Sequence, residues 1–520
     1  MSSTLVETLS KHSWSGEPIS VLPRAHSQGR SASKQSIDVP GSTVSIKESD
    51  RVSISAQNLS QTPITATHAG DSLIANPGEG SDNDKAKQKR RYRLVVASII
   101  WCFIVMGLND GSLGPLLPIY QEYYNINFIT VSVLFICGCS GCITAAVLNV
   151  FVSRLFALSK ILVLGTAFQV VAHSILSSAP PFYAMCIAFF LNGMGAALLN
   201  AQGNSLLSML HDPTSMGLAH ASYGFGALIG PLISTQFANI YTTTGSKRWA
   251  LYYTVMLGTV LSSMIVFIVV FRGKGYEEIL HDIGVPAFKP EGIEMTNTNE
   301  QNRSSLDGGH SGDEGGESEA VSRRARESDS FASVLKQSAV HTLAAFIFIY
   351  VGLEVTIGGW IVTFMINERG GGASSGYVSS GFFAGLALGR VTLLWVNKKL
   401  GERNAVFLYI AIGIGLEFTV WFVPSLIGNA IAVSFVGLVL GPFYPIVMSQ
   451  TGRIIPRKVL SGSIGWIAGF GQSGSAILPF ATGALANRYG IISLQPLIVA
   501  MMAAMAVLWF MVPSSTKKKD

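Results

Sequence analysis

Charged residues are scarce in this chain. Only 13% of its 520 residues are Asp, Glu, Lys or Arg, while 49% are hydrophobic. A soluble globular chain carries about a quarter charged residues. The mean hydropathy is +0.43, although two polar segments dilute it. The deficit predicts an integral membrane protein. The formal net charge of +6 does not indicate nucleic-acid binding, because the basic residues lie beside hydrophobic segments.

The chain also lacks the signatures of several other functions. The N-terminus shows no charged n-region followed by an apolar stretch, so no cleaved signal peptide is expected. No Gly-x-x-x-x-Gly-Lys-[Ser/Thr] phosphate loop occurs among the 54 glycines, which leaves a gradient as the driving force for any transport. Zinc needs four convergent ligands, and the cysteine cluster has no nearby His or second Cys pair. We therefore expect no enzyme, no cofactor and no metal site. The five cysteines, all in apolar segments and expected to pack against neighbouring helices, are Cys102, Cys137, Cys139, Cys142 and Cys186.

Long apolar runs predict an all-α membrane protein with twelve transmembrane helices in two pseudo-symmetric six-helix bundles. A spanning helix needs about 20 mainly apolar residues. The first six spans are expected near 94–121, 129–152, 160–179, 182–210, 216–242 and 249–271. The second six are expected near 339–367, 375–396, 404–424, 426–450, 460–486 and 492–513.

The polar segments complete the predicted organisation. Residues 1–93 are rich in Ser, Thr, Asn and Gly and are expected to form a disordered cytoplasmic tail. The two bundles then occupy 94–271 and 337–513, joined by a cytoplasmic linker at 272–336. Residues 514–520 form a basic cytoplasmic tail.

The distribution of Lys and Arg predicts that both termini are cytoplasmic. The basic residues on the expected inside are Lys85, Lys87, Lys89, Arg90, Arg91, Arg93, Arg154, Lys160, Lys398, Lys399, Arg403, Arg453, Arg457, Lys458, Lys517, Lys518 and Lys519. The far fewer on the expected outside are Lys247, Arg248, Arg369 and Arg488. A single missed span would destroy this asymmetry.

Two carboxylates lie inside expected spans at related places in the two halves. Asp110 follows Gly107-Leu108-Asn109, and Glu354 follows Gly352-Leu353. Ionisable groups at membrane depth are costly and usually face a water-filled path or a partner. At matching places in two repeats they predict a transport site between the halves. A desolvated carboxylate can bind and release a proton, so both are candidates for proton and substrate coupling. The alternatives are a structural hydrogen bond for Asp110 and an ion pair with Arg390 for Glu354.

The repeat extends to a glycine-proline spacing, and together these features resemble the major facilitator superfamily over residues 94–513. Gly226 and Pro231 are five residues apart in the fifth span, as are Gly474 and Pro479 in the eleventh. The run Lys398 to Arg403 looks like the basic motif of the superfamily, whereas the first-half counterpart around Arg154 lacks the usual Asp-Arg pair. The pattern Gly-Leu-Asn-Asp-Gly-x-Leu-Gly-Pro-Leu-Leu-Pro before Tyr120, with Gly389-Arg390, is similar to the fucose-permease-like branch. Within that branch it looks most like fungal bypass-of-stop-codon type membrane proteins.

This resemblance implies a functional role for Asp110, because sugar/proton symporters of the branch require an aspartate in this motif. They also carry a glutamate shortly after a Gly-x-Gly in the fourth helix. Here Gly193-Met194-Gly195 is followed by apolar residues and Asn200, so that glutamate is absent. Glu354 is the candidate for supplying a second carboxylate from the other half.

Further polar and aromatic residues in the spans are candidates for the substrate cavity or for structural roles. Asn200 and Asn204 share one helix face, and amides suit hydroxyl-rich ligands; interhelical hydrogen bonding is an equal alternative. Aromatic rings stack on sugars but also pack anywhere apolar. The cavity candidates are Asn109, Asn200, Asn204, Trp360, Tyr444 and Gln472. His173 and His220 fit a proton relay or a structural role.

Several residues are expected to control gating. Gly230 permits close helix contact and Pro231 bends its helix; together they resemble part of an antiporter motif. Arg390, Arg154 and Arg403 are assigned to structural gating.

These observations predict a secondary transporter that works by alternating access and couples a small polar solute, such as a sugar, to protons. Two alternatives stay open: proton-driven efflux of an amphipathic metabolite or drug, and a transport-inactive membrane sensor or adaptor. The expected partners are a small-molecule substrate, protons and membrane lipid, with no nucleic acid. A monomer in the plasma membrane is expected.

Overall fold

The computed structural model describes residues 82–210, 212–244, 247–285, 334 and 336–513, and the regular structure of these residues is helical throughout. Residues 1–81 of the predicted tail, 286–333 of the linker and the C-terminal 514–520 lie outside the described residues.

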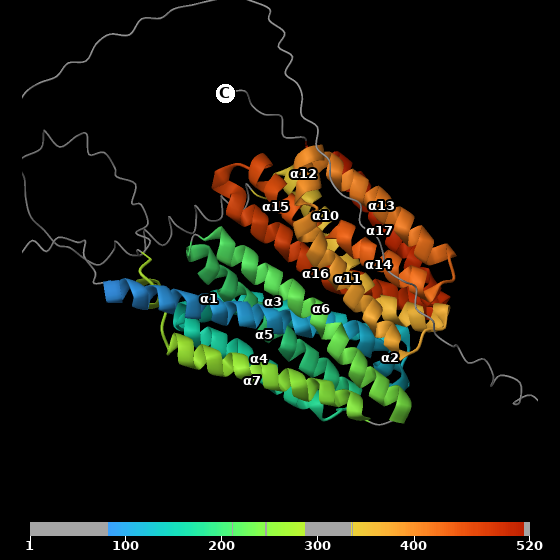
Figure 1. Ribbon diagram of the computed structural model, residues 1–520, viewed down its shortest axis with the longest axis horizontal. Coiled ribbons are helices and arrows are strands. Elements are labelled where there is room, and N and C mark those ends of the chain that lie inside the picture. Colours follow the sequence, from blue (N-terminus) through green and yellow to red (C-terminus); the bar gives the residue numbers. More distant parts are fainter. Residues whose placement is uncertain (1–81, 211, 245–246, 286–333, 335, 514–520) are drawn as a thin grey trace, which may run out of the picture. The chain divides into compact units, whose positions relative to one another are not determined.

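The first half follows the expected spans closely (Figure 1). Residues 82–93, which the sequence places in the tail, extend the first helix because good helix formers such as Lys, Arg and Gln dominate there. The first span is also divided at Ser112. The helices are α1 (Asp82–Gly111), α2 (Leu113–Tyr124), α3 (Phe128–Leu155), α4 (Leu158–Ser177), α5 (Phe182–Met209), α6 (Pro213–Thr244) and α7 (Leu251–Phe271).

The second half repeats this order, with two of its spans divided instead of one. Its helices are α10 (Ser338–Arg369), α11 (Gly376–Thr392), α12 (Leu394–Leu400), α13 (Glu402–Phe422), α14 (Leu426–Leu440), α15 (Phe443–Ile454), α16 (Arg457–Tyr489) and α17 (Leu494–Met511). The two halves form two helix bundles in Figure 1. We call the end of the bundles that carries Tyr124 and Arg369 the outer end, and the end that carries Leu155 and Leu400 the inner end.

Ten helical segments of the described chain are long and apolar enough to cross a membrane, or eleven if α11 and α12, bent by 50°, form one span. The predicted span that does not meet this criterion is the eleventh, α16. Its many Gly and Ser residues and Gln472 dilute its hydropathy. It packs along α10 as α6 packs along α1, so it occupies the place that the repeat requires.

The glycines of the repeat hold equivalent helix contacts. A Cβ at Gly226 of α6 would lie 2.1 Å from the Ile104 carbonyl oxygen of α1. A Cβ at Gly474 of α16 would lie 2.0 Å from the Phe348 carbonyl oxygen of α10. Because only glycine allows helices to approach so closely, the shared pattern fixes the same pairing in both halves.

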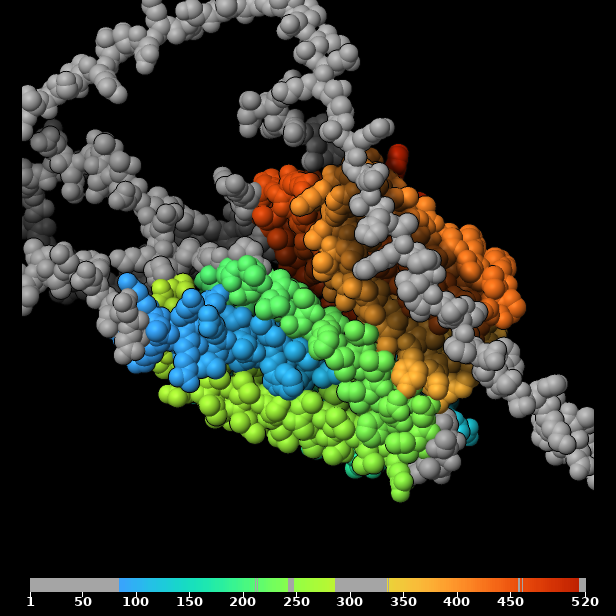
Figure 2. All heavy atoms as spheres, viewed as in Figure 1, coloured from blue at the N-terminus to red at the C-terminus, as the bar shows by residue number. Residues whose placement is uncertain are grey.

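The halves meet mainly through three pairs of helices: α3 with α16, α6 with α11, and α2 with α10. Figure 2 shows α6 lying against α11. The tightest approaches lie towards the outer end. A Cβ at Gly114 would lie 2.2 Å from the Gly358 carbonyl oxygen, and one at Gly483 of α16 would lie 2.6 Å from Ser132 of α3. Backbone and small side chains therefore join the halves near the outer end.

A short helix, α8 (Tyr276–Asp282), lies in the segment that the sequence assigns to the linker. Ile279 and Leu280 are buried in the core of the first half. Lys274 Nζ lies 2.6 Å and Arg91 Nε 3.6 Å from the Asp282 carboxylate. The linker is therefore anchored to the inner end of the first half as far as α8.

Candidate functional site

Asp110 lies at the end of α1, and its carboxylate is held by uncharged groups of the first half. The Tyr223 hydroxyl of α6 donates a hydrogen bond to Oδ2 at 2.8 Å, and Asn109 Nδ2 donates to Oδ1 at 3.1 Å. The side chain is nevertheless exposed, although the neighbouring Leu108 is buried. An exposed carboxylate in the middle of a spanning segment is accessible to water or to a ligand.

A second layer of polar residues supports Asn109. His173 of α4 is fully buried; its Nε2 lies 3.3 Å from Asn109 Oδ1 and its Nδ1 lies 2.7 Å from the Gln169 carbonyl oxygen. Gln169 Nε2 in turn donates to Asn192 Oδ1 of α5 at 3.4 Å. The chain of contacts from α5 through α4 to α1 therefore orients the amide beside Asp110.

Glu354 lies in α10 and faces Arg390 of α11. Arg390 Nη2 lies 3.8 Å from Glu354 Oε1, with the two side chains 26% and 16% exposed. This contact is the ion pair that the sequence left open for Glu354. Arg390 Nε is buried and has no hydrogen-bond partner within the described residues. Tyr350 of α10 and Tyr444 of α15 lie beside the pair.

The two carboxylates lie close enough for their charges to interact across the halves. Tyr223 of the first half lies within electrostatic range of both Glu354 and Arg390, and His220 lies within range of Arg390. We refer to Asp110, Tyr223, Glu354 and Arg390 as the central cluster. The central cluster thus combines two acidic side chains, one basic side chain and a phenol, which come from four different helices. Such an arrangement can bind a proton or a polar ligand.

The remaining predicted cavity residues do not all join this cluster. Asn200 is exposed and accepts a hydrogen bond from Asn204 Nδ2 at 2.7 Å, along one face of α5. Gln472 of α16 is exposed, and its backbone carbonyl oxygen lies 3.5 Å from Cys139 Sγ of α3. Trp360, in contrast, is fully buried, and its indole donates to the Pro479 carbonyl oxygen at 3.0 Å. Its ring packs near Phe128 and Phe135 of α3, so in this conformation it belongs to the contact between halves.

The predicted gating residues have varied surroundings. A Cβ at Gly230 would lie 2.4 Å from the Leu108 carbonyl oxygen, two residues before Asp110, and Pro231 lies inside α6. Arg154 is exposed in the last turn of α3. Arg403 donates to the carbonyl oxygens of Val512 and Phe510 at 2.6 and 3.1 Å, so it caps the last turn of α17.

Polar junctions lie near the inner end of each half. In the second half, Glu402 accepts hydrogen bonds from Gln450 at 2.9 Å and from Ser449 at 3.2 Å, and Arg453 Nη2 lies 3.0 Å from it. In the first half, Gln202 donates to Asn149 Oδ1 at 2.7 Å and accepts from the Tyr276 hydroxyl of α8 at 2.5 Å. Burial raises the pKa of Tyr276 to about 12, so this phenol remains a donor at neutral pH.

Tyr223 and Tyr350 are absent from the residues proposed on sequence grounds. A tyrosine in an apolar helix carries no sign of which neighbour it faces, because Tyr packs in membranes at many positions. Both tyrosines lie within one turn of close glycine contacts, such as that of Gly107 against Tyr223. This proximity identifies them as site residues only once the pairing of the helices is known.

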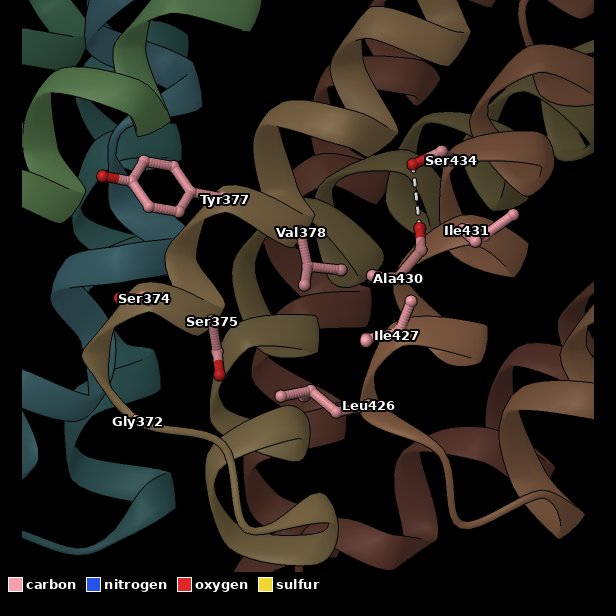
Figure 3. A pocket seen from close by; sticks show the side chains of 10 residues that line it. All are labelled: Gly372, Ser374, Ser375, Tyr377, Val378, Leu426, Ile427, Ala430, Ile431 and Ser434. Atoms are coloured by element: carbon pink, nitrogen blue, oxygen red, sulfur yellow. Dashed lines mark hydrogen bonds between the residues drawn. The ribbon is translucent and has the colours of Figure 1, made fainter. Parts of the chain in front are cut away.

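A cavity of about 380 Å³ lies away from the central cluster, between the outer ends of α11 and α14 (Figure 3). Leu426, Ile427 and Val378 make most of its wall apolar, and Ser375 and Ser434 supply hydroxyls. It contains no acidic or basic side chain, so it does not share the chemistry of the central cluster.

Long apolar helices in two similar halves of the described chain, with an exposed carboxylate in one half and a half-buried ion pair in the other, define a multi-pass membrane protein of the transporter class. The chain belongs to the Major Facilitator Superfamily, whose family model matches residues 99–479. It is a transporter family, so the chain is a membrane transporter and not an enzyme.

Two curated proteins are similar over most of their length. Bypass of stop codon protein 6 of Saccharomyces cerevisiae is 25% identical over 445 residues, which cover 82% of this chain and 83% of that protein. The glucose/mannose transporter GlcP of Bacillus subtilis is 22% identical over 389 residues, covering 74% of this chain and 86% of that protein.

Solved structures share the fold at low sequence identity. A bacterial homologue of the human lysosomal transporter Spinster, inward-facing and unoccupied, has a TM-score of 0.57 and 12% identity, covering 83% of this chain and 98% of that one. A peptide transporter, POT, in complex with sulfate has a TM-score of 0.59 and 13% identity, covering 80% and 93%.

Proposed function

We propose that this protein is a proton-coupled secondary transporter that works by alternating access and moves a small polar solute, with a hexose as the first substrate to test. The observation that carries the proposal is the central cluster, in which the exposed Asp110 of one half lies within electrostatic range of Glu354 of the other half, and Glu354 faces Arg390. The name of the GlcP relative, a glucose/mannose transporter, supports the choice of hexose. We further propose that both termini are cytoplasmic and that the protein resides in the plasma membrane.

Asp110 is the proposed proton-binding residue. Its partners Tyr223 and Asn109 are neutral, so a proton can bind without leaving a cation unpaired. Glu354, in contrast, already faces Arg390 at 3.8 Å, and a change in either charge alters this ion pair within the second half. Proton binding at Asp110 would remove a negative charge near Glu354. The strength of the ion pair between Glu354 and Arg390 would then change, because nearby charges affect it.

The polar solute would bind next to the central cluster. Asn200 and Gln472 are exposed and offer amide donors and acceptors from the two halves. The close packing at the outer end supports a conformation closed at that end, and opening would require α3 to separate from α16 and α6 from α11. Trp360 becomes available to a solute only in that second conformation.

The test is transport in reconstituted vesicles with an imposed pH gradient. Hexose uptake that is driven by an inward proton gradient, with matching proton movement, supports the proposal. Asp110→Asn is expected to abolish accumulation against a gradient while it preserves hexose exchange at equilibrium, because the amide oxygen can still accept one of the two hydrogen bonds but the side chain binds no proton. Glu122→Gln, at an exposed site, is the control. Unchanged accumulation by Asp110→Asn at normal expression would refute Asp110 as the coupling residue.

Export of an amphipathic metabolite is the second candidate function. The specific observation is the tight packing of Gly230 beside Pro231 against α1, directly before Asp110. Extrusion of a lipophilic cation against its gradient, with proton entry and no hexose movement, would favour it.

A further inference from the structure

Glu417 is a fully buried carboxylic side chain that no step of the proposed mechanism uses. It lies in α13 near the outer end of the second half and is 0% exposed. Within the described residues neither of its oxygens has a hydrogen-bond partner. An ionised carboxylate without a partner in such a place costs several kcal/mol or more.

The helices packed against α13 supply no cation at this depth. They are α12, α14 and α17, and neither α14 nor α17 contains an ionisable residue. Lys398 and Lys399 of α12 are exposed at the inner end. Glu402 and Arg403 lie in the first turn of α13, at that same end.

Arg369 of α10 is the charged group at the outer end of α13. Its Nη2 donates to the carbonyl oxygens of Val420 and Trp421 at 2.7 and 2.9 Å. Val420 is three residues beyond Glu417, on the same helix face. The guanidinium therefore lies about one turn from Glu417 and forms no ion pair with it; Nη1 and Nη2 donate to backbone carbonyls, and the buried Nε has no hydrogen-bond partner within the described residues.

The two halves place a titratable group at the same point of equivalent helices. His173 and Glu417 are each the sixteenth residue of α4 and α13, and both are 0% exposed. His173 contacts Asn109, and the repeat aligns Asn109 with Glu354. Glu417 thus occupies in α13 the position that His173 occupies in α4.

We propose that Glu417 is a proton-binding site of the second half, occupied in this conformation. One proton from the aqueous phase binds one carboxylate oxygen and gives a neutral acid. The proton leaves when a movement of α13 brings the carboxylate to water or to the Arg369 guanidinium. The use of this proton in transport rests on the proposed function, whereas its binding does not.

Infrared spectroscopy of the purified full-length protein tests the binding. Glu417→Gln replaces a neutral acid with a neutral amide of similar shape, so the variant is expected to fold. The carbonyl band of protonated carboxyl groups at neutral pH is expected to lose one component in Glu417→Gln. It should lose none in the control Glu122→Gln, whose carboxylate is exposed. An unchanged band in Glu417→Gln overturns the proposal.

Stability against pH provides a second readout. If folded Glu417 keeps a proton that the unfolded chain releases, the wild type loses stability as pH rises, because the folded state binds more protons. The apparent melting temperature of Glu417→Gln should therefore exceed that of the wild type by a margin that grows from about pH 5 to about pH 8. A Glu417→Gln protein that is less stable than the wild type at every pH would indicate an ionised, paired Glu417 and would also overturn the proposal.

The outcomes separate this proposal from the proposed function. If transport proves independent of protons, the infrared and melting results still decide whether Glu417 holds a proton. If both hold, Glu417→Gln should lower the number of protons moved per solute, while the Glu122→Gln control leaves it unchanged. Loss of the infrared component together with an unaltered proton number would overturn the link between Glu417 and transport.

Discussion

The two halves of this transporter hold their central carboxylates and their inner-end junctions with different kinds of side chain. In the first half, Asp110 is held by Tyr223 and Asn109, and the inner-end junction consists of uncharged side chains. In the second half, Glu354 faces Arg390, and the inner-end junction joins Glu402 to Arg453. A carboxylate whose hydrogen-bond partners are neutral can bind or release a proton without leaving a cation unpaired. We therefore expect Asp110 of the first half to titrate and Glu354 of the second half to stay paired with Arg390.

The largest expected effect breaks the second-half ion pair. Arg390→Ala leaves Glu354 without its cation in a half-buried site and should destabilise the protein by about 3 kcal/mol. Tyr223→Phe removes one hydrogen bond to Asp110 and should cost only about 1 kcal/mol. Chemical denaturation in detergent measures both. The double variant Arg390→Ala with Glu354→Gln should recover much of the loss, and equal effects of Arg390→Ala and Tyr223→Phe would contradict the contrast between the halves.

The next largest effect tests a feature that the halves share, the close glycine contact between two paired helices. Gly226→Ala and Gly474→Ala each place a Cβ within 2.1 Å of a carbonyl oxygen of the paired helix. Each should destabilise the protein by about 1–3 kcal/mol through overpacking. The control is Gly258→Ala, whose Cβ meets nothing within 4 Å. Tolerance of one substitution but not the other, in thermal melting, would show that the repeated contact is not equivalent.

A smaller effect on stability is expected at the two inner-end junctions, and its dependence on salt distinguishes them. Glu402→Gln weakens a contact with Arg453, whose side chain is 53% exposed, and should cost less than about 1 kcal/mol. Tyr276→Phe removes a hydrogen bond between neutral groups and should cost about 1 kcal/mol. At high salt the cost of Glu402→Gln should shrink, because salt screens exposed charges, while that of Tyr276→Phe should not. Melting temperatures at two ionic strengths provide the measurement, and a salt-sensitive Tyr276→Phe would count against a neutral junction.

The smallest expected effect concerns a second carboxylate of the first half whose partners are uncharged. Asp212 caps α6 through the Thr214 and Ser215 amides and accepts from the Tyr92 hydroxyl at 2.8 Å. Hydrogen bonds, above all from the Ser215 side chain, hold the pKa of Asp212 well below its usual value of about 3.8. The carboxylate therefore stabilises the fold above that usual value, and the contribution is lost as pH falls towards the lowered pKa. The small stability gap between wild type and Asp212→Asn should close in acid; a gap that widens there would reverse the assignment.

Most of the fold follows from hydropathy, because spanning helices need apolar runs of defined length. The twelve expected segments coincide with helices or divided helices of the described chain. The divisions at Ser112, between α11 and α12, and between α14 and α15 escape this reasoning, since a bend within an apolar run leaves its hydropathy unchanged. The helix α8 escapes it as well, because it is too short to give a periodic signal.

Less of the candidate site can be predicted from the sequence. Asp110 and Glu354 stand out because charge is rare in apolar runs, and the structure brings them near each other. Tyr223, on the other hand, is recognised only from the pairing of α1 with α6. Glu417 carries the same compositional signal as Glu354, but it belongs to neither repeated motif, and the absence of a hydrogen bond or ion pair to its described neighbours follows only from the three-dimensional packing. Trp360 shows the opposite case, a residue with suitable chemistry that packing places between the halves.

The anchoring of α8 has a practical consequence for cutting and splicing this chain. Because Ile279, Leu280 and Asp282 are bound to the first half, a protease site, fluorescent reporter or split point introduced between residues 272 and 285 would damage one folded half. A chain divided after Val285 retains α8 with its own bundle. Two separately expressed fragments, 1–285 and 286–520, are therefore the natural pieces with which to reassemble the transporter.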